Sequence, residues 1–164
     1  MQYAKDSFYM ALRARLAALD NTRTVIIGDT PRPAIAVAEN EPASCAPLPP
    51  RAFILRWGQT QIAAGAESCS RPLMKMDCEI HYRTSGDNAG ATRGRDLCAL
   101  DLELLQICSP PRTSKCDFSH TPPVSLAGAV FWSGLEFLPA ETHGSELRRI
   151  ARLQLFYFPE VKQA

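Results

Sequence analysis

The fold is decided by residues 74–83, which read MKMDCEIHYR, because apolar and polar side chains alternate there without a break. One face of an extended chain would carry Met74, Met76, Cys78, Ile80 and Tyr82. Ten residues of strict alternation predict a strand with one buried face and one solvated face. A parallel sheet covered on both sides would show a continuous apolar run instead, so we expect an antiparallel or mixed sheet.

Two amphipathic helices are expected, one at the start of the chain and one after the central strand. The first is capped by Asp6 or Ser7, ends at residues 20–21, and places four apolar side chains at three- and four-residue spacing: Phe8, Leu12, Leu16 and Leu19. The second begins at Thr92 or Arg93, ends before the prolines at 110–111, and carries Leu97, Leu100, Leu104 and Ile107 on one face.

Further strands are expected on both sides of the second helix. Residues 24–27, 34–38 and 51–57 precede the central strand, with Gly58 ending the third, and residues 130–138 and 150–158 follow around a hairpin loop at 139–147. The order is one helix, four strands, one helix and two strands. It predicts an α+β fold in which two helices pack on one face of a mostly antiparallel sheet.

Length and composition bound the class of protein. The chain has 164 residues, 46% hydrophobic and 21% charged, so we expect one domain over residues 1–164. A net charge of +1 lacks the basic excess of a dedicated nucleic-acid binder. No window approaches about 20 apolar residues and the first residues do not resemble a signal peptide. We therefore expect a soluble, compact chain that does not use the general export route.

Prolines and cysteines mark the loops and the redox state. Ten of the 13 prolines fall within residues 31–50 and 110–123, and long loops are expected at 39–50, 59–72 and 109–123. Six cysteines would suit a disulfide framework in a secreted chain. Because Cys78 and Cys98 lie in strand and helix patterns, we expect reduced, buried thiols instead.

The search for a catalytic or phosphate-binding motif finds none: there is no G-x-S-x-G, H-E-x-x-H or Walker sequence. Gly86, Gly90 and Gly94 are not followed by the Lys-Ser or Lys-Thr that would meet phosphates. His143 falls in the expected hairpin turn, where it would be solvated. We expect no enzyme, no catalytic residues and no cofactor.

Two alternative hypotheses of a chemical site, a zinc site and a hydrolase triad, remain open. Cys108, Cys116 and His120, with Asp117 nearby, could ligate zinc, although zinc sites usually show two close ligand pairs. Asp117, Ser119 and His120 contain the residue types of a hydrolase triad, but triads converge from distant segments. Cys78 and His81 are three apart on a strand and so face opposite sides. A small hydrolase or zinc protein is the alternative from another class, while no metal site is our expectation.

Aromatic residues near the end of the chain form the remaining unusual feature. Along the last strand one face carries Ala151, Leu153, Leu155 and Tyr157, and the other begins with Arg152 and Gln154 and ends with Phe156 and Phe158. The aromatic side chains either form a core cluster or a patch covered by another subunit. If they form a patch covered by another subunit, the expected interface residues are Phe131, Trp132, Phe156, Phe158 and Trp57.

In element order and local motifs the chain resembles the tail terminator proteins of long-tailed phages. Residues 8–16 are similar to the family's opening helix, and Pro33-Ala34-Ile35-Ala36-Val37 is similar to its P-A-V-A-V strand. Residues 132–134 and 153–157 resemble its closing strands, and the strand at 74–83 followed by a helix also matches. The likeness covers most of the chain in order, with long inserts at 39–50, 59–72 and 109–123 and a high cysteine content as departures.

The resemblance implies a structural protein of the virion. Such proteins are small α+β domains that form a hexameric ring on the finished tail tube, stop its polymerisation and provide the interface for head attachment. The implied partners are further copies of the chain, the tail tube protein and head–tail connector proteins, with DNA passing through the ring and no membrane. The implied location is the tail or neck of the virion, assembled in the host cytoplasm. Another neck, tail-completion or contractile-injection component is the nearest alternative.

Overall fold

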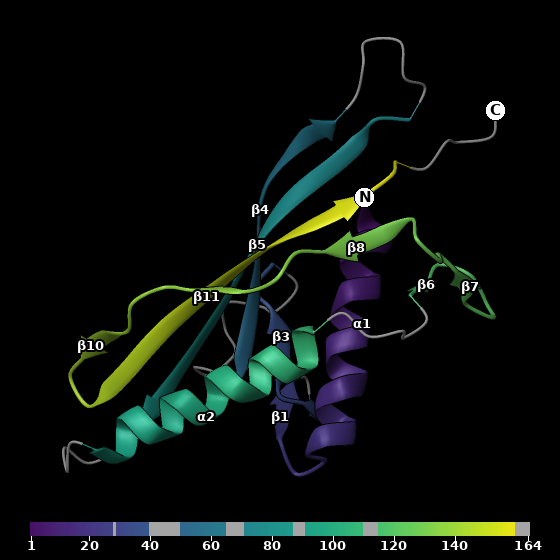
Figure 1. Cartoon of the computed structure of the whole chain (residues 1–164). Helices are drawn as coiled ribbons and strands as arrows, with labels where there is room; N and C mark the ends of the chain where they lie inside the picture. The colour runs from purple at the N-terminus through teal and green to yellow at the C-terminus, as the bar shows by residue number, and fades with distance from the viewer. Residues whose placement is uncertain (28, 40–49, 65–70, 87–90, 110–114, 160–164) are drawn as a thin grey trace.

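The fold combines two helices with a mixed, mostly antiparallel sheet, which confirms the expected α+β class (Figure 1). The computed structural model describes residues 1–27, 29–39, 50–64, 71–86, 91–109 and 115–159. The helices are α1 (Gln2–Leu19) and α2 (Ala91–Cys108). The strands are β1 (Thr24–Ile27), β2 (Thr30–Pro33), β3 (Ile35–Val37), β4 (Phe53–Ala64), β5 (Leu73–Ser85), β6 (Cys116–Asp117), β7 (Val124–Ser125), β8 (Val130–Trp132), β9 (Glu136–Phe137), β10 (Glu141–His143) and β11 (Glu146–Tyr157).

The main sheet is built around β5, the strand predicted from its alternation. β5 pairs antiparallel with β11 over 12 residues on one side and with β4 on the other, and β3 joins β4 in parallel. Met76, Cys78, Ile80 and Tyr82 are buried, while the polar residues between them are partly exposed. The alternation of the sequence is therefore the alternation of the two sheet faces.

The far side of β11 is lined by three short strands rather than one. β8, β9 and β10 pair with β11 in turn, and residues 133–135 and 138–140 interrupt them. At each interruption three residues oppose two of β11, which is the pattern of a β-bulge. The expected strand at 130–138 is thus broken, and the expected loop at 139–147 is mostly strand. Its turn is short and includes Gly144, whose φ of +58° suits glycine.

Gly58 lies within β4 and does not end it, so the expected loop at 59–72 is wrong for residues 59–64. The β4–β5 register shifts between Trp57 and Thr60, and a Cβ on Gly58 would lie 3.1 Å from the Cβ of Asp77. The glycine therefore permits a close approach at a bulge. β4 is exposed from residue 58 to 63, and residues 65–70 lie outside the described residues.

Both helices pack on the same face of the sheet, as expected. Phe8 on α1 is fully buried, and its ring centroid lies 4.9 Å from that of Trp132 and 6.2 Å from that of Trp57. The cap of α1 lies five or six residues earlier than predicted: Met1 occupies the cap without a side-chain hydrogen bond, and Ser7 is buried inside the helix. Leu19, expected on the apolar face, is 48% exposed.

A polar cluster fastens α2 to the sheet. Tyr82 and Arg149 both donate hydrogen bonds to the carboxylate of Asp101 on α2, each at 2.5 Å. Burial, and then the bond to Asp101, raises the pKa of the Tyr82 hydroxyl, which therefore stays protonated. Two residues further along α2, Glu103 forms an ion pair with Arg23 at 2.6 Å.

Two small ribbons complete the described structure. β1 and β2 form an antiparallel hairpin that includes Pro31, where no strand was predicted, and β6 pairs with β7. The second pair falls at the end of the expected loop 109–123, of which residues 110–114 lie outside the described structure, as do residues 40–49 of the expected loop 39–50. Neither described helix is long and apolar enough to span a membrane.

Removing the Phe8 ring should strongly destabilise the fold, because the ring is fully buried between two tryptophans. We expect Phe8→Ala to lower the free energy of unfolding by about 3–5 kcal/mol. Urea denaturation followed by circular dichroism measures it. The control Leu19→Ala removes an exposed side chain of the same helix and should change stability by no more than about 0.5 kcal/mol. Equal losses would contradict this packing.

Candidate interaction surfaces

The face of the sheet opposite the helices, here called the open face, is covered by no helix among the described residues. It presents the partly exposed or exposed side chains that point away from the core: Ile54, Arg56, Lys75, Asp77, Glu79, His81, Arg83, Glu146, Arg148, Ile150, Arg152, Gln154 and Phe156. Antiparallel sheets commonly leave one face solvated in this way. Charged residues dominate the open face, and two isoleucines interrupt them.

Ion pairs neutralise much of the charge on the open face. Glu79 accepts bonds from His81 at 3.0 Å and from Arg152 at 2.9 Å. Burial raises the pKa of Glu79, but the bonds from His81 and Arg152 outweigh it and hold that pKa below its usual value. Glu146 likewise lies 2.7 Å from both Arg83 and Arg148, and the bond from Arg148 holds its pKa below the usual value.

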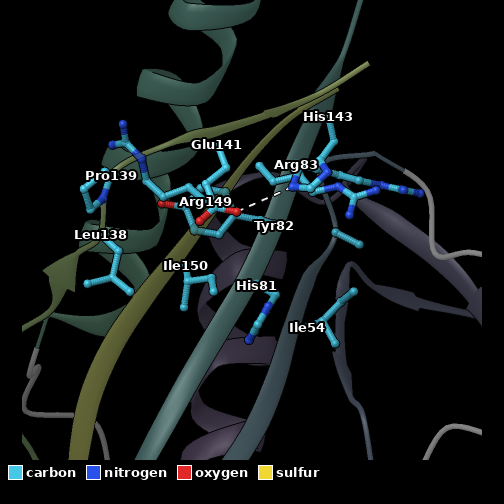
Figure 2. Close-up of a pocket in the computed structure, with 12 residues that line it drawn as sticks. Ile54, His81, Tyr82, Arg83, Leu138, Pro139, Glu141, His143, Arg149 and Ile150 are labelled. Carbon is cyan, nitrogen blue, oxygen red and sulfur yellow. Dashed lines mark hydrogen bonds and ion pairs between the residues drawn. The ribbon is translucent and has the colours of Figure 1, made fainter. Parts of the chain in front are cut away.

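A cavity of about 530 Å³ opens at the end of the open face nearest the β10–β11 turn (Figure 2). His81 pairs across the sheet with Ile54 on one side and Ile150 on the other, so these side chains lie in a row in the cavity. Its remaining lining residues include Leu138, Pro139, Arg83, Glu141, His143 and Arg148. With Tyr82 and Arg149 also in its lining, the cavity combines apolar surface with several ionisable side chains. Binding sites usually combine apolar lining with polar groups.

A second surface lies on α2, on the flank turned away from the sheet. Arg95, Cys98, Leu102 and Leu105 follow one another at spacings of three, four and three residues, and all four are exposed. Leu102 is 62% exposed and Leu105 is 45% exposed. Residues at this spacing share one side of a helix, so they form a continuous row, here called the outer stripe.

The five interface residues predicted from the sequence do not form one surface. Phe131 and Phe156 stack on the open face with ring centroids 5.0 Å apart, and Phe131 and Phe158 are each 38% exposed. Trp132 points to the opposite side: it is buried in the core, and its indole N–H donates to the carbonyl of Cys108 at 2.8 Å. Trp57 is half-buried against Phe8. Three of the five are therefore placed at or near the surface.

The structure does not assemble the alternative zinc or triad sites. Among the described residues no three His, Cys, Asp or Glu side chains are grouped as a metal would require. Burial raises the pKa of the Cys108 thiol to about 12, whereas His120 is exposed. Ser119 donates to Asp117 at 2.6 Å and not to His120, which is the bonding of a local turn rather than of a triad.

No disulfide joins the described cysteines to one another, but the expectation that they are buried is only partly correct. Cys78 and Cys108 are buried, Cys116 is intermediate, and Cys98 is exposed on the outer stripe. His143 lies at the end of β10, exposed as predicted, with Glu141 at 3.5 Å.

Neither the outer stripe nor the cavity is among the features predicted from the sequence. Leu102 and Leu105 are visible as a second apolar row on the helix, since they repeat at three-residue spacing beside Cys98. The cavity had no such signal, because it depends on which residues of β4, β5 and β11 are paired.

Comparison with known proteins gives a likeness in structure but no match to a family. No protein-family model matches the chain, and no curated protein matches it. A chain in a solved structure described as the virion of a native gene transfer agent particle is similar at 21% identity and a TM-score of 0.40. The likeness covers 92% of this chain and 90% of that one. At that TM-score it carries no argument about function.

Acid should weaken the two open-face carboxylate clusters. Glu79 and Glu146 have lowered pKa values in the folded chain, so each stabilises the fold above its unfolded pKa, and that contribution is lost as the pH falls through the folded pKa. The urea concentration at the unfolding midpoint should therefore stay constant from pH 7 to about pH 5 and decrease at pH values below about 4. The fall should be smaller in the variant Glu79→Gln/Glu146→Gln. The same fall in both proteins would contradict a stabilising role for these pairs.

Proposed function

We propose that this chain is a structural subunit of a phage-like tail, a tail terminator that closes into a ring on the end of the tail tube and acts without catalysis. The observation that carries the proposal is the presence of two different apolar surfaces on opposite sides of the sheet. The outer stripe lies on the helix side, and the cavity lies on the open face. The Phe131–Phe156 stack is a separate apolar group on the open face, near the other end of β11.

Two unlike surfaces favour head-to-tail assembly over a two-fold dimer. A two-fold dimer uses one self-complementary patch, whereas a ring joins one patch of each subunit to a different patch of the next. Because the sheet separates the outer stripe from the open face, one subunit can contact two neighbours at once. Exposed apolar groups in continuous rows are also the usual mark of a protein interface.

The tail position in this proposal comes from the resemblance to tail terminators. The described elements follow the order of that family: an opening helix, strands leading to β5, a helix, and closing strands that end with β11. By this analogy the ring holds six copies, contacts the tail tube protein on one side and the head–tail connector on the other, and leaves a passage for DNA. The ring would be assembled in the host cytoplasm and remain in the virion.

The purified chain should form a closed oligomer of about six times its 18.1 kDa mass. Light scattering gives the mass, and negative-stain images show whether the particle is a ring. A chain that stays strictly monomeric at micromolar concentration, even with tail tube protein present, would contradict the proposal.

Copurification identifies the position of the ring. A tail terminator should retain tail tube protein when both are produced together. Retention of portal or connector proteins alone would indicate a head-side neck component instead, and would overturn the terminator assignment while leaving a structural role.

A further inference from the structure

We infer that successive subunits join by seating the outer stripe of α2 in the open-face cavity of the next copy. This inference rests on the proposed ring and names the contact that would close it. It commits to a second copy of this chain as the occupant of the cavity, on the grounds of charge complementarity, apolar complementarity and matching spacing.

The outer stripe offers one cation followed by apolar side chains. Leu102 is among the most exposed large apolar side chains of the described chain, and Leu105 is exposed beside it. Arg95, two turns before Leu102, is exposed and has no ion-pair partner among the described residues. Other exposed leucines and isoleucines stand singly, as is normal on protein surfaces. The outer stripe differs because its members form a row that begins with an unpaired charge.

The cavity offers the complementary set. Ile54, Leu138 and Ile150 supply apolar surface, and Glu141 stands at the edge with its side chain 76% exposed. The ion pair of that carboxylate within the described part of the chain is with His143, at 3.5 Å. The three arginines that line the cavity are paired with other carboxylates: Arg83 and Arg148 with Glu146, and Arg149 with Asp101. Glu141 therefore keeps most of its surface available to a cation from outside.

The spacing of charge and apolar groups agrees between the two surfaces. Seven residues of helix separate Arg95 from Leu102, a rise of about 10 Å. Glu141 of β10 lies opposite Arg148 of β11, and Arg148 is two residues from Ile150 along β11. Strand geometry therefore places the Cα atoms of Glu141 and Ile150 about 8 Å apart. The long arginine side chain readily spans the difference, so Arg95 can meet Glu141 of the next copy while Leu102 meets the isoleucines.

A charge exchange tests the polar part of the contact. Arg95→Glu and Glu141→Lys should each weaken assembly at least tenfold in concentration, because each places like charges together across the contact. The double variant Arg95→Glu/Glu141→Lys should restore assembly, since the charges are then opposite again. Light scattering over a dilution series gives the midpoint. Single variants that assemble like the wild type, or a double variant no better than the singles, would overturn the contact.

Apolar variants test the rest. Leu102→Asp and Leu105→Asp should abolish assembly at concentrations where the wild type is fully assembled. Leu19→Asp places the same charge on an exposed leucine of α1 and should assemble normally. Circular dichroism shows whether each variant is folded. If an aspartate variant is unfolded, the charge exchange tests the contact in its place. A wild-type ring that tolerates these changes would overturn this contact alone, whereas a monomeric wild type would overturn the proposed ring as well.

Discussion

The antiparallel pairing of β5 with β11 is the constraint on which the rest of the molecule depends. Twelve consecutive residues of β11 are matched to β5, from Glu146 opposite Ser85 to Tyr157 opposite Met74. A shift of one residue would turn every buried side chain of one strand to the solvent. The same register places Ile150 beside His81 and Arg152 beside Glu79, so it determines the core and the open face together.

The sheet divides the molecule into two sides that are stabilised differently. On the helix side, stability comes from buried aromatic and aliphatic groups and from the bonds of Tyr82 and Arg149 to Asp101. On the open face, the carboxylates of Glu79 and Glu146 are each bound by two side chains, and Ile54 and Ile150 line the cavity. A partner that approaches the open face therefore meets several charges that are already paired, whereas the Glu141 side chain at the cavity edge is 76% exposed.

Much of the fold could be predicted because its strongest signals are local. The alternation of residues 74–83 and the apolar spacing of both helices depend only on neighbours in sequence, and both are correct except at the exposed Leu19. Gly58 was misread because a glycine in a strand can mark a bulge as well as an end, and the difference lies in its contact with Asp77. Trp132 was misread as a surface candidate because its partner Phe8 is distant in sequence. The cavity could not be predicted, since four strands contribute to it.

The two tryptophans of the chain both lie beside Phe8, on the helix side of the sheet. Trp132 is enclosed by the core, and Trp57 is half-buried with the Lys5 ammonium 5.4 Å from its ring centroid. The inferred contact involves neither ring. Intrinsic fluorescence of this chain thus reports unfolding of the helix layer and is insensitive to that contact, so folding and self-association can be followed separately in one solution.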